Sequence, residues 1–159
     1  WSKGSLLNFC IGQGEILVTP IQVFNYINLL ATKGNSNSPH LVSSTKKDSE
    51  NEIPLSSKIW DRITFDMGQV VSHAKGTGKN ADPAIQGAKI YGKTGTAENP
   101  HGEDHAWFIG WLEYEKKKFS IVVLLENSGS GGAVAAPLAK NIFDKIILGI
   151  NNSKQISMK

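Results

Sequence analysis

The sequence predicts an α+β fold, in which helices cover an antiparallel sheet. Apolar residues recur at helical spacing over about 19–33 and 56–75, alternate with a period of two over about 88–126, and return to helical spacing over about 133–148. Helices and strands that occupy separate parts of a chain are typical of this class. With 159 residues, the chain is long enough for one domain with its own core.

The first helix, about 19–33, has a clear start and stop. Thr19 is expected to cap it, Pro20 suits the first helical position, and Gln22 can close a capping box. Gly34 supplies a left-handed stop. The residues expected to face the core are Ile21, Phe24, Ile27, Leu30 and Ala31.

A polar surface connection over residues 35–53 leads to the second helix, and only Leu41-Val42 is apolar enough for a short extended piece. The second helix, about 56–75, begins near Ser56 or Ser57 and stops at Gly76. Its apolar side is expected to carry Trp60, Ile63, Met67, Val70, Val71 and Ala74.

Three strands are expected at about 88–97, 106–113 and 118–126, the last two joined by a charged turn at Tyr114 to Lys117. The closing helix, about 133–148, is amphipathic. Its apolar face is expected to contain Leu138, Ile142, Ile146 and Ile147. Residues 150–159 are polar, and we expect them to fray.

Composition limits the classes of partner. The net charge of +3 is spread along the chain apart from Lys116 to Lys118, which we interpret as a solvated turn rather than a nucleic-acid patch. The longest apolar run, Ile121 to Leu125, is far shorter than the roughly 20 residues of a membrane span. Cys10 is the single cysteine, so no internal disulfide forms, and its apolar neighbours predict a buried structural thiol. Because the chain starts with Trp1, we expect it to be the C-terminal portion of a longer protein.

Residues 87 to 97 read GAKIYGKTGTA and allow two chemical interpretations. Gly87 through Thr94 fit the G-x-x-x-x-G-K-T phosphate loop, while Lys93-Thr94-Gly95 fits the K-T-G triplet of serine acyl enzymes. A phosphate loop needs a buried strand before it and a helix after it. Residues 81–86, which include Pro83, make a poor central strand, and residues 95–102 cannot form a helix of useful length, so we favour a strand.

As a strand, this segment places Thr94 and Thr96 on one side and Lys93 and Gly95 on the other. Two hydroxyls on an open strand can bind a substrate carboxylate, and a nearby lysine adds positive potential. Gly95 lets another element pack closely, and backbone amides at the strand edge can donate to a developing oxyanion.

Wider motifs connect this strand to a known family. In order along the chain they are Ile11-Gly12-Gln13-Gly14, Val18-Thr19-Pro20-Ile21-Gln22, Pro39-His40-Leu41-Val42, Gly76-Thr77-Gly78, Gly92-Lys93-Thr94-Gly95-Thr96-Ala97, His105-Ala106-Trp107-Phe108-Ile109-Gly110 and Ala135-Ala136-Pro137. On these residues the chain resembles the transpeptidase domain of class B penicillin-binding proteins, most closely the penicillin-binding protein 2 group.

The resemblance implies acyl transfer without a cofactor or metal. A serine attacks a peptidoglycan stem peptide ending in D-Ala-D-Ala, and a second stem amine resolves the acyl enzyme into a cross-link. By position, Lys93 would tune the electrostatics and proton traffic of the cleft. Thr94 and Thr96 would bind the substrate carboxylate beside Gly95, and the backbone amide of Thr96 would donate to the oxyanion. Trp107 and Phe108 would support the cleft.

The resemblance also implies partners and a location. These are β-lactam antibiotics, the N-terminal half of the transpeptidase domain, a lipid-II-polymerising glycosyltransferase and elongation-complex proteins, with no nucleic acid. The parent protein would sit in the bacterial inner membrane with its catalytic domain on the periplasmic side.

The family also needs an S-x-x-K nucleophile motif and an S-x-N motif upstream of K-T-G. Ser43-Ser44-Thr45-Lys46, Ser49-Glu50-Asn51 and Ser72-His73-Ala74-Lys75 match by letter. We reject them because the first two lie together in a polar stretch with no helix to bury the lysine. We therefore expect the nucleophile outside this sequence, an inactive isolated chain, and an exposed apolar face that favours aggregation.

Other interpretations stay open. His101 to His105 offers metal ligands, but Pro100 and Gly102 favour a strand-connecting loop. Asn127 to Gly132 resembles a dinucleotide loop but lacks its third small residue, which favours a strand-to-helix turn. Alternative functions are a serine β-lactamase or β-lactam sensor domain, a non-catalytic binding or scaffold domain, and a nucleotide hydrolase.

Overall fold

The computed structural model describes residues 2–14, 16–36, 39–42 and 51–157. Its elements, in order, are α1 (Lys3–Cys10), α2 (Pro20–Ala31), β1 (Asn35–Ser36), β2 (Asn51–Glu52), α3 (Ser57–Ser72), the short 3₁₀ turn η1 (Lys79–Ala81), β3 (Lys89–Ala97), β4 (His105–Tyr114), β5 (Lys117–Leu125), the π-helical turn η2 (Gly131–Ala135) and α4 (Ala136–Ser157). The predicted α+β class is confirmed.

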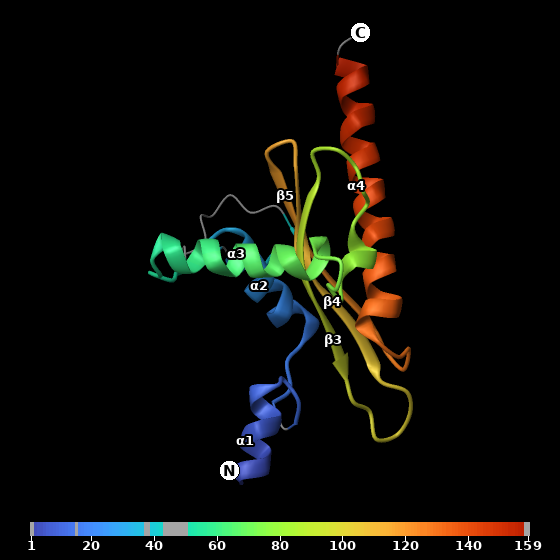
Figure 1. Ribbon diagram of the computed structural model, residues 1–159. Helices are drawn as coiled ribbons and strands as arrows, with labels where there is room; N and C mark the ends of the chain where they lie inside the picture. The colour runs from blue at the N-terminus through green and yellow to red at the C-terminus, as the bar shows by residue number, and fades with distance from the viewer. Residues whose placement is uncertain (1, 15, 37–38, 43–50, 158–159) are drawn as a thin grey trace.

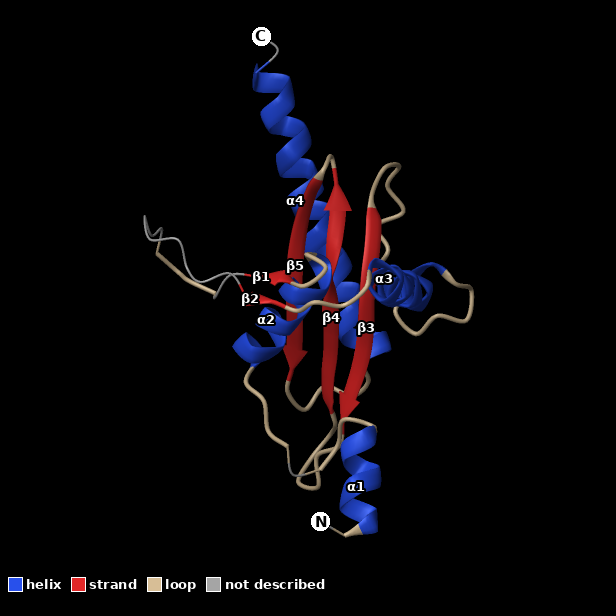
Figure 2. Cartoon of the chain, turned by 90° about the vertical axis from the view of Figure 1, so that its left-hand side faces the viewer, coloured by secondary structure: helices blue, strands red, loops and turns tan. Residues whose placement is uncertain are grey.

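The centre of the fold is an antiparallel sheet in the order β3-β4-β5. α4 lies along one face of this sheet, while α2 and α3 lie on the other side (Figures 1 and 2). The strands agree with the expected ones to within one residue at either end, because alternation of apolar side chains is strong there. The turn between β4 and β5 places Glu115 and Lys116 at positive φ, as a tight hairpin requires.

Two hydrophobic clusters cover the two faces of the sheet. The larger cluster joins β3, β4 and β5 to α4, with Phe108, Leu112 and Phe143 fully buried at its centre. The smaller cluster joins α2 and α3 to the opposite face and includes Trp60 and Trp111. The sheet is therefore the middle of three layers, with α4 on one face and α2 and α3 on the other.

α2 forms as its sequence predicts. Thr19 and Gln22 make both hydrogen bonds of a capping box, and Pro20 occupies the first turn. Gly34 has φ +95° and its amide donates to the Leu29 carbonyl at 2.9 Å, which ends the helix. Ile21 was expected in the core but is exposed.

α3 begins at Ser57, as expected, but ends at Ser72 instead of reaching Gly76. His73 already has extended backbone angles, and Ala74, expected on the apolar side, is exposed. The expected extended piece at Leu41-Val42 is also wrong. Both residues are exposed bends, and the short strand pair forms between β1 and β2.

α4 differs most from its prediction. It continues to Ser157, so the expectation of a frayed tail after Gly149 is wrong for the described residues. Its buried face is Ala139, Phe143 and Ile147, whereas Leu138 and Ile142 are more than one third exposed. Small alanines face the sheet because the helix approaches it closely.

α1 was not predicted, and Cys10 at its end is exposed, which corrects the expectation of a buried thiol. No residue of α1 is buried. Among the helices of the described residues, none has the length and apolar character needed to cross a bilayer.

Candidate active site

Lys93, Thr94, Gly95 and Thr96 lie in β3, which pairs with β4 on one side; no other described strand pairs with it. Thr94 lies opposite Phe108 and Gly95 opposite Trp107. Thr94 and Thr96 therefore share the face that α4 covers, and Lys93 and Gly95 share the other, as the alternation predicted. The strand runs through the segment to Ala97, so the phosphate-loop interpretation is wrong.

The backbone of Thr96 points away from β4. Its carbonyl accepts a hydrogen bond from Gln13 Nε2 at 3.0 Å, and the Thr94 carbonyl accepts one from Lys93 Nζ at 2.6 Å. In an antiparallel pair, the N–H and C=O of one residue point to the same side. The amide of Thr96 is therefore directed off the outer edge of the strand, where a bound group would meet it.

The two threonine hydroxyls have different environments. Thr94 is 8% exposed, and its Oγ1 lies 2.7 Å from Thr77 Oγ1. Thr96 is exposed, and its Oγ1 accepts a hydrogen bond from the Gly131 amide at 3.2 Å. Because Gly131 occupies a lone pair of Thr96, the hydroxyl hydrogen of Thr96 stays directed to other acceptors. Thr96 thus presents the more accessible hydroxyl.

Gly131 allows the start of η2 to lie directly on the sheet. A Cβ on Gly131 would lie 2.2 Å from the Gly95 carbonyl oxygen and 2.3 Å from that of Trp107, so a side chain does not fit there. Asn80 Nδ2 donates to the Gly132 carbonyl at 3.0 Å and ties this turn to η1. The Asn127 to Gly132 segment therefore forms the expected strand-to-helix turn, with a closely packed end.

The two aromatic residues of β4 pack differently. Phe108 is fully buried beneath Thr94, where Gly92 leaves room for its ring. Trp107 is half-buried on the opposite face, and its Cβ lies 3.2 Å from the position of a Cβ on Gly95. Gly95 therefore makes room for Trp107 of the neighbouring strand.

Loop 98–104 connects β3 to β4, as expected for His101 to His105. His105 Nδ1 accepts a hydrogen bond from the Asn127 amide at 3.0 Å, and Asn99 Nδ2 donates to Asn127 Oδ1 at 2.6 Å. In the described part of the chain, no group of three or more His, Cys, Asp or Glu side chains is arranged to hold a metal ion.

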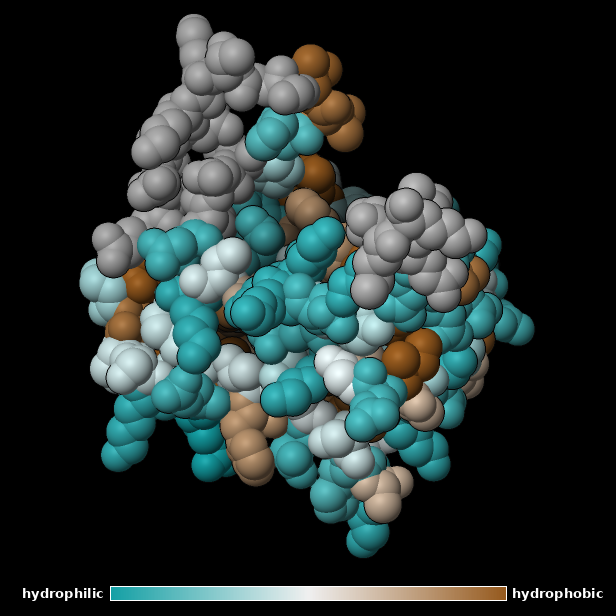
Figure 3. Space-filling model, turned by 90° about the horizontal axis from the view of Figure 1, so that it is seen from above, coloured by the Kyte–Doolittle hydropathy of each residue, from teal (hydrophilic) through white to brown (hydrophobic). Residues whose placement is uncertain are grey.

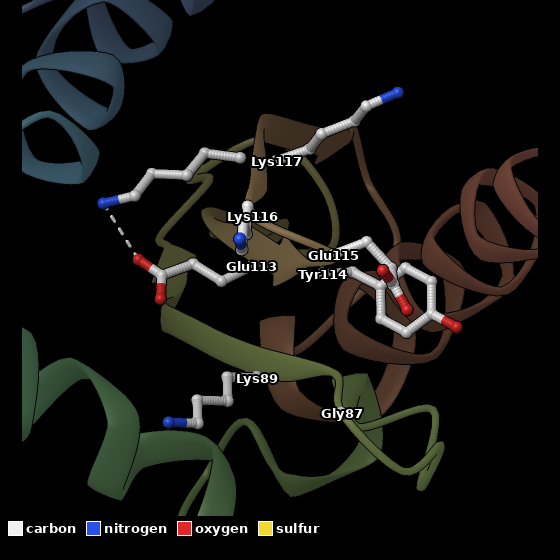
Figure 4. Close-up of a pocket in the computed structure, with 8 residues that line it drawn as sticks. Gly87, Lys89, Glu113, Tyr114, Glu115, Lys116 and Lys117 are labelled. Atoms are coloured by element: carbon white, nitrogen blue, oxygen red, sulfur yellow. Dashed lines mark ion pairs between the residues drawn. The ribbon is translucent and has the colours of Figure 1, made fainter.

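Two hollows lie away from Lys93–Thr96. One, of about 230 Å³, lies at the β4–β5 turn among lysine and glutamate side chains, where Lys118 pairs with Glu113 at 2.9 Å (Figure 4). The other, of about 410 Å³, lies between α3 and the start of β3. Neither of these two hollows is lined by Lys93, Thr94, Gly95 or Thr96.

One of the serine motifs rejected in the sequence analysis has its serine among the described residues. Ser43 to Lys46 and Ser49 lie outside the described residues, while Asn51 begins β2. Ser72 is the last residue of α3, and its hydroxyl donates to the Gly68 carbonyl at 3.0 Å.

Three residues that contact the Thr94–Thr96 segment were not predicted as site residues. They are Gln13, Thr77 and Gly131. The first two belong to the Gly12-Gln13-Gly14 and Gly76-Thr77-Gly78 motifs, and this was the available sign in the sequence. The direction of their side chains depends on the fold.

Comparisons with known proteins agree with this geometry. The family described as penicillin binding protein transpeptidase domain matches residues 1–144. Peptidoglycan D,D-transpeptidase MrdA of Haemophilus influenzae is 33% identical over 169 aligned residues, covering 91% of this chain and 26% of that protein. Peptidoglycan D,D-transpeptidase PbpA of Mycobacterium tuberculosis is 30% identical, covering 87% of this chain and 31% of that protein.

Solved structures give the same assignment. Pseudomonas aeruginosa PBP2 in complex with WCK 5153 superposes with a TM-score of 0.78 and 35% identity, covering 91% of this chain and 32% of that one. PBP2 of Helicobacter pylori, solved with MreC, gives a TM-score of 0.72 and 31% identity, covering 91% and 28%. The chain spans about a quarter to a third of the length of these relatives. By sequence and fold, the chain belongs to the penicillin-binding protein transpeptidase family, and its relatives include the PBP2 and MrdA proteins.

Proposed function

We propose that this chain forms the Lys93–Thr96 wall of the active site of a peptidoglycan D,D-transpeptidase. The observation that supports this most directly is the outward direction of the Thr96 amide on a strand edge without a described partner. A preorganised amide aimed at a developing oxyanion is typically a large contribution to acyl transfer. Of the three rejected motifs, the one with a described serine places Ser72 at the end of α3, where its hydroxyl donates to the Gly68 carbonyl. We therefore infer, as the sequence predicted, that the nucleophile comes from polypeptide outside this sequence.

The proposed reaction has two acyl transfers. A serine Oγ attacks the carbonyl carbon of the penultimate D-alanine, the C–N bond breaks, and the terminal D-alanine leaves as an amine. A second stem amine then attacks the resulting ester, and serine is released with its proton. The Thr96 amide stabilises the oxyanion in both steps. The exposed Lys93 side chain supplies positive potential and assists proton transfer in the cleft.

The substrate carboxylate is proposed to bind on the α4 side of β3. Thr96 donates its hydroxyl hydrogen, because its Oγ1 already accepts from Gly131. Thr94 is only 8% exposed, and its hydroxyl would contact the carboxylate beside the hydroxyl of Thr77, which lies 2.7 Å away. Gly95 leaves the opposite face open to Trp107, and Phe108 fixes the strand from beneath.

Partners and location follow from the same proposal. The partners are D-Ala-D-Ala stem peptides, β-lactam antibiotics, the upstream half of the transpeptidase domain, a lipid-II-polymerising glycosyltransferase and elongation-complex proteins. The parent protein would be held at the bacterial inner membrane with this domain on the periplasmic side. Exposed apolar residues in 6–21, including Leu7 and Leu17, support a covering upstream segment.

Intact-mass analysis after incubation with a penicillin tests the proposal. The isolated chain is expected to show no covalent adduct. When the upstream part of the parent protein is supplied, an adduct is expected on that added part. Lys93→Met should slow acylation of the reconstituted protein by roughly 10²-fold or more, since an electrostatic group at the reacting centre is lost.

The matched control is Lys89→Met, which removes another exposed lysine from the same face of β3. It should leave acylation within about twofold of the unsubstituted protein, as expected for a surface charge distant from the reacting atoms. An adduct on any serine of the isolated chain would instead make the chain a self-sufficient acyl enzyme. Equal acylation of both lysine variants would remove Lys93 from the site.

A further inference from the structure

We propose that Gln13 is a positioning residue for the Thr96 backbone, an inference that rests on the proposed function of this strand edge. Its Nε2 donates to the Thr96 carbonyl at 3.0 Å across a large sequence separation. Gln13 thereby contacts the end of β3 that carries the proposed oxyanion donor.

The end of β3 needs support from outside the sheet. Ala97 pairs with His105 at the last position of the β3–β4 ladder, and the loop 98–104 follows directly. The N–H and C=O of Thr96 point away from β4 and make no hydrogen bond in the ladder. The hydrogen bond from Gln13 therefore holds the Thr96 carbonyl from the outer side, while the neighbouring Gly95 and Ala97 face β4.

The loop that carries Gln13 aims its side chain. Gly12 and Gly14, on either side of it, have φ +76° and +96°, conformations that suit glycine. The Gln13 amide donates to the Asn8 carbonyl at 2.9 Å, which anchors the loop to the end of α1. The side-chain amide can then reach Thr96 in one conformation.

Thr96 is held from two directions as a result. Gly131, at the start of η2, donates to its hydroxyl oxygen, and Gln13 donates to its carbonyl. The carbonyl retains a second lone pair for an incoming peptide N–H, because a carbonyl oxygen accepts two hydrogen bonds. Gln13 is neutral, so it holds the Thr96 carbonyl without adding charge next to an oxyanion.

Nuclear magnetic resonance of the 15N,13C-labelled chain, at a concentration where sedimentation shows a monomer, tests this role. The variants are Gln13→Glu, which has nearly the same shape but no donor, and Gln13→Met. The matched control is Gln86→Glu, since Gln86 is an exposed glutamine in the loop before β3. The ligand probe is N-acetyl-D-alanyl-D-alanine, followed through the Thr96 amide resonance.

The unsubstituted chain is expected to show a scalar coupling across the hydrogen bond from Gln13 Nε2 to the Thr96 carbonyl carbon. Both Gln13 variants should lose this coupling and bind the probe about tenfold more weakly, as expected for loss of one hydrogen bond that holds the site. Gln86→Glu should change neither property.

Two contrary outcomes are distinguishable. Unchanged probe affinity in both Gln13 variants would overturn the positioning role and leave the proposed function intact. A Thr96 amide that does not respond to the probe even in the unsubstituted chain would overturn both the proposed ligand site and this inference.

Discussion

The N-terminal segment, residues 3–18, exposes its hydrophobic side chains, whereas the sheet and α4 bury theirs. In the first, Leu6, Leu7, Phe9, Ile11 and Leu17 are all between 46% and 91% exposed. In the second, residues of the same kind are buried between strands and helix, and Phe108, Leu112 and Phe143 have no exposed surface. Apolar composition is therefore similar, but burial is not.

This difference separates the region that is stabilised by contacts within the chain from the region whose apolar surface stays available to the proposed upstream segment. Burial of apolar surface stabilises by roughly 25 cal/mol per Å², so the two buried clusters around the sheet stabilise the fold, whereas α1, with no buried residue, contributes little. α1 extends from the end of the sheet (Figure 1), and Gln13 links its loop to β3. The hairpin end of the molecule, seen from above, is mostly hydrophilic with separate hydrophobic patches (Figure 3).

A pair of phenylalanine truncations tests the comparison most strongly. Phe143→Ala should lower the free energy of unfolding by about 3–5 kcal/mol, because it opens a cavity in the core between α4 and the sheet. Phe9→Ala removes the same ring from a residue that is 46% exposed and should cost less than about 1 kcal/mol. Chemical denaturation of both variants measures the difference.

Equal losses in the two phenylalanine variants would break the comparison, since they would mean that α1 belongs to the same cooperative unit as the sheet. Addition of the upstream part of the parent protein should change the cost of one phenylalanine variant and leave that of the other unchanged. Phe9→Ala should then become more costly, while the effect of Phe143→Ala should stay as before.

The threonine pair at the proposed site is expected to give the next largest effect. Thr94→Val removes a hydroxyl from a residue that is only 8% exposed, together with its hydrogen bond to the exposed Thr77, which should cost about 0.5–1.5 kcal/mol in the free energy of unfolding. Thr96→Val changes an exposed hydroxyl and should cost less than about 1 kcal/mol. Thermal unfolding of both variants, with circular dichroism as the measure, compares them.

The double variant Thr77→Val with Thr94→Val should cost less than the sum of the two single variants, because the hydrogen bond between the two hydroxyls is then lost only once. Additive losses would contradict a direct hydrogen bond between the two side chains. A larger cost for Thr96→Val than for Thr94→Val would reverse the assignment of Thr94 to the packed region.

The sequence allowed good prediction where local rules act alone. Alternation identified β3, β4 and β5, and the Thr19 and Gln22 capping box identified the start of α2. The alternating faces of Lys93 and Thr94 followed from strand geometry. These features depend on residues close together in sequence, so no knowledge of tertiary packing was needed.

Prediction failed where contacts between residues far apart in the sequence determine which side chains are buried. Leu138 and Ile142 were expected in the core, but α4 buries Ala139 and Phe143 and leaves Leu138 and Ile142 more than one third exposed. Cys10 has apolar neighbours along the chain, but nothing in the described structure buries α1. The Gly12-Gln13-Gly14 motif drew attention to Gln13, but its contact with Thr96 depends on the fold and could not be predicted from the sequence.

The C-terminal turns of α4 provide a smaller test. Polar residues predicted fraying, but Lys154 Nζ pairs with Glu115 Oε2 at 2.6 Å and Tyr114 Oη bonds Asn151 Oδ1 at 3.0 Å. Lys154→Met should cost about 0.2–1 kcal/mol, since both partners are about half exposed. Faster amide hydrogen exchange confined to residues after Gly149 would be the measured sign. The control, Lys140→Met, removes a pair within one helix and should leave these amides unchanged.

The smallest effect at neutral pH is expected from Tyr91, which stacks on Trp111 with ring centroids 4.9 Å apart. Burial, and then the nearby Glu113 carboxylate, raise the pKa of Tyr91 above its ordinary value of 10.0. The unfolded chain therefore loses this proton first as pH rises above 10.0, so the free energy of unfolding falls there, while the contribution is fully present below that pH. Tyr91→Phe should flatten this alkaline decline, and Tyr26→Phe, at an exposed tyrosine, should not. Denaturant titrations between about pH 8 and 11 measure the slope, and equal slopes in both variants would show that Tyr91 is not protected by the sheet.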